Sequence, residues 1–146
     1  MSKDLKIDFR RGGLTSVEQT VVADGFDAHG DEQGAPEYRK ERVSWIAVDG
    51  QAETMGVLTA DILWDWIYVD ELWVSQALRG QGLGRDLMRR MEAFARSEQL
   101  EGIWLWTQSW QAEGFYTALG YSPFTRFDNF PRGHSRIGFR KTLSRA

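Results

Sequence analysis

The segment Arg79–Gly84, with the sequence Arg-Gly-Gln-Gly-Leu-Gly, constrains the fold of this chain more than any other feature. It lies between an apolar stretch, Trp66–Val74, and an amphipathic one, Gly82–Gln99. The first N–H groups of a helix have no helical partners and carry a partial positive charge. Because the glycines keep side chains away, a diphosphate can approach these donors. We predict a pyrophosphate-binding turn in which Arg79 either bonds a phosphate or pins the turn through neighbouring carbonyls.

Glycines at alternate positions also occur in other turns, and the context separates them. A dinucleotide-binding fold has this turn after the first strand of a parallel sheet, and a P-loop needs Gly-Lys-Ser or Gly-Lys-Thr, which is absent. Here Val43–Val48, Thr54–Leu63 and Trp66–Val74 come first, and we expect them to be consecutive antiparallel strands. Asp49-Gly50 is a two-residue hairpin signal. A tight turn without a ligand stays open as an alternative.

The rest of the chain predicts strands and helices around the same sheet. Leu5–Arg10 alternates with a period of two and predicts a short first strand. Thr15 followed by Glu18 predicts a helix start, and Gly25–Pro36 is expected to be a solvent-facing loop. The later predicted elements are a strand at Ile103–Thr107, a helix at Gln111–Leu119 and strands at Tyr121–Phe127 and Ser135–Leu143. We expect a single domain, residues 1–146, of the α+β class, with a mixed, mostly antiparallel sheet of about seven strands flanked by helices.

Composition argues against several classes of protein. The net charge of −3 disfavours a nucleic-acid partner, and the lack of cysteine excludes disulfides, thiolate metal sites and a cysteine nucleophile. No stretch approaches the roughly 20 apolar residues that span a bilayer, and the amino terminus lacks the apolar region of a signal peptide. We expect a cytoplasmic protein with no membrane partner and no metal. His29 and His134 have no partner motif.

Three segments resemble the GNAT superfamily of N-acetyltransferases, in the family's order and over nearly the whole chain. The most specific is Val69–Val74 running into Arg79–Gly84, which is similar to the family's fourth strand and its arginine-or-glutamine, x, x, glycine, x, glycine turn. Ala112–Tyr121, with Phe115-Tyr116 and Leu119-Gly120-Tyr121, resembles the family's tyrosine helix and the strand after it. Arg140–Leu143 resembles the closing strand.

The resemblance implies a sheet that is splayed between the family's fourth and fifth strands, with acetyl-CoA as the acetyl donor and its pantetheine arm in the gap. Main-chain groups of the fourth strand would pair with the pantetheine, and N–H groups of the turn, from Gln81 to Arg85, would hold the pyrophosphate. The residues implied in cofactor binding are Leu72, Trp73, Val74, Arg79, Gly80, Gln81, Gly82, Leu83, Gly84, Arg85, Gln111 and Tyr116.

The implied reaction is direct attack of an amine on the thioester, which needs a base for the amine and a proton for the thiolate. Tyr116 matches the family position whose hydroxyl acts as general acid, and the alternative is a core aromatic residue. Asp70 and Glu71 are the candidate bases. As neighbours on a strand they are expected to point to opposite faces, so that one faces the cleft, with Glu71 slightly preferred. Solvated or paired carboxylates are the alternative.

One position departs from the family pattern. Ser109 stands where the family often has an asparagine before the tyrosine helix. Gln111 is the candidate to replace that amide at the pantetheine, and a solvated first helical turn is the alternative.

The leading functional hypothesis is an acetyl-CoA-dependent N-acetyltransferase that acetylates a primary amine of a small molecule or peptide. The alternatives are a catalytically silent acyl-CoA-binding or regulatory module and an interaction domain that uses the tryptophan-rich sheet as an interface. Six of the seven tryptophans fall between Trp64 and Trp110, where they can wall a cleft or fill a core. The expected partners are an amine-bearing acceptor and, as in many similar proteins, a second copy of the chain in a homodimer.

Overall fold

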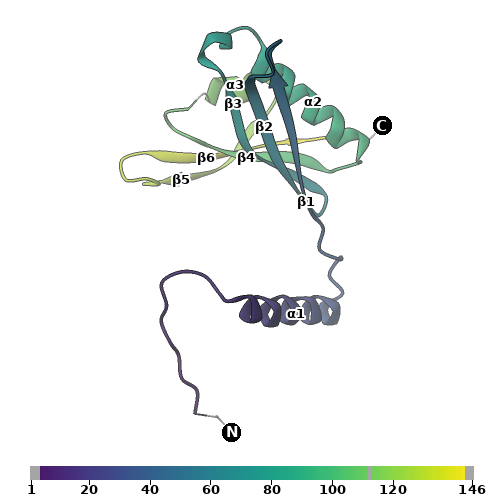
Figure 1. Cartoon of the computed structure of the whole chain (residues 1–146), viewed down its shortest axis with the longest axis vertical. Helices are drawn as coiled ribbons and strands as arrows, with labels where there is room; N and C mark the ends of the chain where they lie inside the picture. The colour runs from purple at the N-terminus through teal and green to yellow at the C-terminus, as the bar shows by residue number, and fades with distance from the viewer. Residues whose placement is uncertain (1–3, 112, 144–146) are drawn as a thin grey trace. The chain divides into compact units, whose positions relative to one another are not determined.

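The computed structural model describes residues 4–111 and 113–143, whose elements are labelled in Figure 1. The chain divides into two units, Met1–Glu37 and Tyr38–Ala146. The first unit contains α1 (Ser16–Gln33). The second contains β1 (Lys40–Val48), β2 (Thr54–Leu63), β3 (Trp66–Val74), η1 (Gln76–Leu78), α2 (Leu83–Ser97), β4 (Gly102–Gln108), α3 (Glu113–Ala118), β5 (Ser122–Asp128) and β6 (Ser135–Thr142). Ala112, which belongs to the predicted tyrosine-helix motif, lies outside the described residues.

The helix start predicted at Thr15 is confirmed by a complete capping box. The Thr15 hydroxyl accepts a hydrogen bond from the Glu18 N–H, and the Glu18 carboxylate accepts one from the Thr15 N–H. The predicted loop at Gly25–Pro36 is wrong, because α1 continues to Gln33 and ends at Gly34, which has the left-handed φ of 70° that favours glycine. A glycine inside a helix costs only about 1 kcal/mol, so Gly25 does not end it.

The strand predicted at Leu5–Arg10 is also wrong, since this segment has no regular secondary structure. Alternation of apolar and polar residues describes the faces of a strand but does not provide the neighbouring strand to which it must bond. The described residues therefore form six strands in place of the expected seven or so.

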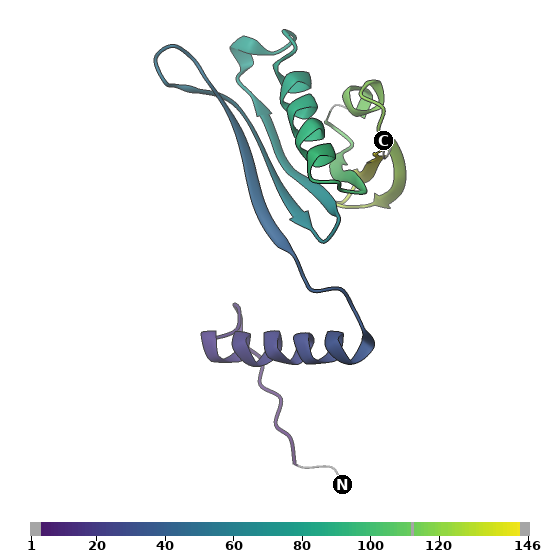
Figure 2. The same ribbon diagram turned by 90° about the vertical axis from the view of Figure 1, so that its right-hand side faces the viewer.

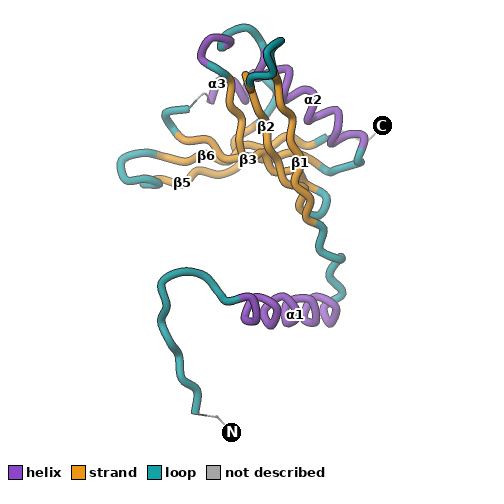
Figure 3. The backbone as a smooth tube through the Cα atoms, viewed as in Figure 1, coloured by secondary structure: helices purple, strands orange, loops and turns teal. Residues whose placement is uncertain are grey.

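The six strands form one sheet in the order β1-β2-β3-β4-β6-β5, drawn in orange in Figure 3. All neighbouring pairs are antiparallel except β3 and β4, which are parallel and joined through α2. The predicted α+β class and the three consecutive antiparallel strands are confirmed. The β1–β2 hairpin is longer than the predicted two-residue turn: the Asp49 carboxylate accepts hydrogen bonds from the N–H groups of Gln51 and Glu53 before β2 begins.

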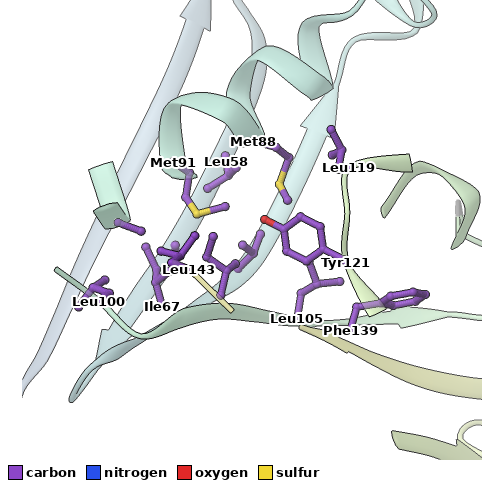
Figure 4. Close-up of a cluster of buried hydrophobic side chains, with 14 of the residues drawn as sticks. Leu58, Ile67, Met88, Met91, Leu100, Leu105, Leu119, Tyr121, Phe139 and Leu143 are labelled. Carbon is purple, nitrogen blue, oxygen red and sulfur yellow. The ribbon is translucent and has the colours of Figure 1, made fainter. Parts of the chain in front are cut away.

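Helix α2 covers one face of the sheet and packs against β2, β3 and β4, as Figure 2 shows. Its apolar side chains recur every three or four residues, which places them on one face. They meet the alternate side chains of the strands, and Figure 4 shows several of the buried residues. The core includes Leu58, Ile62, Ile67, Met88, Met91, Ile103, Leu105 and Phe139.

Two irregularities in β3 position the site. The parallel pairing between β3 and β4 covers only the first residues of β3, from Trp66 to Val69, so the two strands are not paired from Asp70 onward. The implied splay is confirmed at this pair. The second irregularity is a β-bulge: Ala60 of β2 pairs with Val69 and Thr59 pairs with Glu71, which leaves Asp70 as the extra residue.

Candidate active site

A cavity of about 880 Å³ lies at the splay between β3 and β4. Its walls come from the second half of β3, the glycine turn, the start of α2, the end of β4 and helix α3. The lining residues are Asp70, Leu72, Trp73, Val74, Leu78, Arg79, Gly80, Gly82, Leu83, Gly84, Arg85, Trp106, Thr107, Gln111, Phe115 and Tyr116. The residues that the sequence analysis named as catalytic or cofactor-binding candidates all line this cavity, except Glu71 and Gln81.

The glycine turn presents main-chain donors to this cavity. Gly80 and Gly82 have φ values of 77° and 88°, and no heavy atom beyond their chain neighbours lies within 4 Å of the position of a Cβ at either residue. The first helical hydrogen bond of α2 runs from the Asp86 N–H to the Gly82 carbonyl at 2.9 Å, and no side chain caps the helix. The N–H groups before Asp86 are thus free of helical partners at an open surface, which fits a diphosphate.

Arg79 has the role of pinning the turn. Its Nε donates to the carbonyl of Val74 at 3.2 Å, which ties the turn to the end of β3. Because only Nε is used in this bond, the terminal nitrogens of a guanidinium remain as further donors. The two roles that the sequence left open are therefore compatible in one side chain.

Tyr116 of α3 also lines the cavity. Its ring contacts Phe115, Tyr121 and Phe139, with centroid distances of 5.1, 6.2 and 6.0 Å. Burial raises the pKa of the Tyr116 hydroxyl above the ordinary value of 10.0. The phenol is therefore neutral at physiological pH and holds a proton at the cavity wall.

Gln111 also lines the cavity, but its side-chain oxygen is already engaged. Oε1 accepts from the Gln108 N–H at 2.9 Å and from the Thr107 hydroxyl at 3.4 Å. These bonds hold the loop between β4 and α3, and they leave the amide nitrogen of Gln111 as its donor group.

The two candidate bases share one partner, Arg42 of β1. Nη1 of Arg42 lies 2.9 Å from the Asp70 carboxylate and 3.0 Å from that of Asp61, and Nη2 lies 3.2 Å from that of Glu71. The expectation that neighbours on this strand point to opposite faces is wrong here, because the bulge at Asp70 interrupts the alternation. Asp70 lines the cavity, whereas Glu71 accepts a hydrogen bond from the Thr59 hydroxyl at 2.8 Å.

Sequence reasoning assigned no site role to Trp106, Thr107, Leu78 or Phe115, which also line the cavity. Trp106 and Thr107 end the strand that was predicted at Ile103–Thr107. The splay that exposes them is a long-range feature, and the abundance of tryptophans was the one local signal. In the part of the chain that the structure describes, no group of three or more His, Asp or Glu residues is arranged to hold a metal ion.

Among the described residues no helix is both long and apolar enough to cross a membrane.

The sheet order, the splay at its parallel pair and the glycine turn at the start of α2 define an α+β architecture with a cavity at the splay. Residues 14–121 match the model of the acetyltransferase (GNAT) family. The chain belongs to this family.

Individual relatives agree with this assignment. A curated relative, blasticidin-S acetyltransferase of Streptomyces morookaense, is 39% identical over 84 residues, which are 57% of this chain and 62% of the relative. The match thus spans less than two thirds of that relative's length. Among solved structures, an acetyltransferase from Bacillus cereus has a TM-score of 0.79 and 24% identity, with 92% of this chain and 98% of the other covered.

A third similar protein was solved with a bound ligand. It is a Bacillus anthracis protein assigned as a streptothricin acetyltransferase and solved in complex with acetyl coenzyme A. Its TM-score is 0.64 at 19% identity, over 70% of this chain and 63% of the other. At this level of identity the likeness shows the fold alone.

Proposed function

We propose that this chain is an acetyl-CoA-dependent N-acetyltransferase that acetylates a primary amine of a small molecule or peptide by direct attack. The observation that carries the proposal is one cavity that reaches from the glycine turn to Tyr116. A diphosphate-binding turn alone is compatible with a silent binding module. A turn connected to a half-buried proton donor and to the carboxylate of Asp70 supports a transferase.

In this proposal the donor is held mainly by the main chain. The N–H groups from Gln81 to Arg85 hold the pyrophosphate, and the unpaired edge of β3 at Leu72–Val74 bonds the amides of the pantetheine arm. Trp73 and Leu83 provide apolar wall. Gln111 provides its side-chain N–H groups. Bound acetyl-CoA supplies the acetyl thioester.

Two side chains move protons. Tyr116 donates its proton to the departing sulfur, and its raised pKa keeps that proton in place until the thiolate develops. Asp70 receives the proton that the amine loses as its nitrogen bonds to the carbonyl carbon, directly or through water. Glu71 contributes negative charge beside Arg42, which helps to attract a cationic amine.

The acceptor class follows from one relative and remains part of the proposal. Blasticidin-S acetyltransferase is named for an antibiotic, so amine-bearing antibiotics are the first acceptors to test. A cytoplasmic location, a single domain and a homodimer stay predictions.

Calorimetry with acetyl-CoA and a thiol-release assay over a panel of amines test the proposal. We expect acetyl-CoA to bind and free thiol to appear only when an accepted amine is present. If acetyl-CoA binds but no amine is acetylated, the silent acyl-CoA-binding module is favoured. If acetyl-CoA does not bind, the interaction domain is the hypothesis that remains.

A glycine pair separates the turn's role in binding from backbone strain. Gly82→Ala and Gly133→Ala both place a Cβ on a residue with left-handed φ, 88° and 79°, in open space. The backbone cost of about 1–2 kcal/mol is therefore similar. Only Gly82 lines the cavity, so we expect only Gly82→Ala to weaken acetyl-CoA binding, by about tenfold or more.

A further inference from the structure

Arg136 of β6 packs on two aromatic rings beside the candidate active site. Its guanidinium carbon lies 4.6 Å from the ring centroid of Trp106 and 5.2 Å from that of Phe130. A guanidinium packed on aromatic faces is held by cation–π attraction and keeps its N–H edges available for hydrogen bonds. Arg136 is half-buried, so its side chain is positioned before any ligand arrives.

No carboxylate of residues 4–111 and 113–143 forms an ion pair with Arg136. Two other arginines of this unit show the contrast: Arg42 meets three carboxylates, and Arg126 meets Asp128 at 2.9 Å. A guanidinium that is fixed in place without a counter-charge is a ready binding site for an anion, because bidentate bonds to a carboxylate need no further ordering of the side chain.

Trp106 connects Arg136 to the cavity. The same indole ring that packs on Arg136 lines the cavity, together with Asp70 and Tyr116. Tyr68 of β3 makes a second connection. Burial, and then the charge of Asp70, raise the pKa of its hydroxyl, while Arg136 lowers it, so both charged groups are within range of this one hydroxyl. Arg136 therefore lies beside the part of the cavity that Trp106 lines, and the carboxylate of Asp70, the proposed base for the amine, lines the same cavity.

We propose that Arg136 binds a carboxylate on the acceptor, so that the preferred substrates are amines that also carry a carboxylate. The inference rests on the proposed transfer to an amine and adds the second group that the acceptor must present. In this arrangement the ammonium is attracted by Asp70 and the carboxylate by Arg136, with Trp106 between them. The two opposite charges orient the acceptor along the wall of the cavity.

Matched acceptor pairs test the inference. We would measure thiol release with ω-amino carboxylates of increasing chain length and with the corresponding ω-amino carboxamides, which differ only in the charged group. The wild-type chain is expected to have a kcat/KM at least about tenfold higher for the carboxylate at the best length. In Arg136→Gln this preference is expected to disappear because the KM for the carboxylates rises. The kcat/KM for the carboxamides and the affinity for acetyl-CoA are expected to stay unchanged.

Arg140→Gln is the matched control. Arg140 lies on the same strand and also packs on an aromatic ring, with 5.6 Å to the centroid of Phe124, but it packs on no ring that lines the cavity. Its substitution is expected to leave the preference intact. Equal rates for carboxylates and carboxamides in the wild-type chain, or equal effects of the two substitutions, would overturn the inference while leaving the transferase function in place.

Calorimetry separates the proposed acetyl transfer from the proposed binding of a carboxylate by Arg136. If no amine is acetylated although acetyl-CoA binds, the proposed function fails. The anion site is then judged by binding of the amino carboxylates to the complex with coenzyme A. Binding that is lost in Arg136→Gln and retained in Arg140→Gln supports the site, and no binding overturns it.

Discussion

Replacing Glu92 tests how much the buried carboxylate of this residue contributes to the stability of the second unit. Glu92 of α2 is 0% exposed and has three side-chain partners, two of which lie outside its own helix. Its Oε2 accepts from the Tyr121 hydroxyl at 2.7 Å, its Oε1 accepts from Arg89 at 2.8 Å, and Nζ of Lys141 lies 3.3 Å away. The perturbation is Glu92→Leu, which removes the carboxylate and keeps a similar volume.

The expected loss of stability follows from what the partners then lack. Removing one member of a buried ion pair costs about 3–5 kcal/mol, and an unsatisfied buried hydroxyl such as that of Tyr121 costs about 1–3 kcal/mol. Two features reduce the sum: Arg89, 48% exposed, can turn to water, and Lys141, 18% exposed, keeps its bond to the Leu119 carbonyl at 2.9 Å. We expect a net loss of about 3–4 kcal/mol.

Urea unfolding, followed by tryptophan fluorescence, measures this loss as a lower midpoint at unchanged slope. The triple variant Glu92→Leu, Lys141→Met, Tyr121→Phe removes the carboxylate, the ammonium and the hydroxyl together. The free energy of unfolding of this variant is expected to lie within about 1 kcal/mol of the wild-type value, since an apolar replacement leaves no buried charge unpaired. A loss below about 1 kcal/mol for Glu92→Leu alone, or no recovery in the triple variant, would refute the reasoning.

Three further predictions concern single positions. Tyr116→Phe should lower kcat by about 10²-fold with little change in acetyl-CoA affinity. In the wild type the raised pKa of Tyr116 keeps its proton in place near neutral pH, so this residue should cause no loss of turnover there. Unchanged turnover in the variant would contradict its role as the acid. Glu18 should titrate with a pKa of about 2, lowered chiefly by its hydrogen bonds from Arg10 and then by the Thr15 N–H. Its stabilisation of α1 is then complete above pH 4.5 and is lost as the pH falls toward 2. Carboxyl NMR titration should show this pKa rising toward 4.5 in Arg10→Gln, and a value near 4.5 in the unmodified chain would be inconsistent with the bond. Gly102→Ala should destabilise the second unit by about 1–3 kcal/mol, because its Cβ would overlap the side chain of Trp66 and lie 2.7 Å from the carbonyl oxygen of Lys141. Gly50→Ala, in open space, is the control for that measurement, and equal midpoints in urea would argue against the clash.

Local patterns predicted the strands that lead into the site. The bounds predicted for the second and third antiparallel strands, Thr54–Leu63 and Trp66–Val74, agree with β2 and β3 because alternation and the flanking polar residues are properties of neighbouring positions. The same kind of pattern failed at Leu5–Arg10, where no partner strand is present. Gly25 failed as a loop signal because the hydrogen bonds of a helix already begun outweigh the cost of one glycine.

The bulge at Asp70 shows a different limit. A one-residue insertion in the pairing of β2 and β3 is set by how two strands fit together, and no residue type marks it in either strand alone. Without it, the alternation rule assigns Asp70 and Glu71 to opposite faces. With it, both carboxylates meet Arg42, which lies nearly thirty residues earlier on β1.

The donor and acceptor sides of the cavity therefore differ in how far a sequence predicts them. The proposed donor site uses main-chain groups of β3 and of the turn, which are close in sequence, and glycines mark it because the backbone itself must be accessible. The proposed acceptor site is assembled from side chains on β3, β4 and β6, and its selectivity depends on which charges remain unpaired after folding. Arg42 and Arg136 look alike in the sequence. The fold surrounds Arg42 with three carboxylates and packs Arg136 on two aromatic rings, so of these two arginines it is Arg136 that is left to recognise a charged group on a substrate.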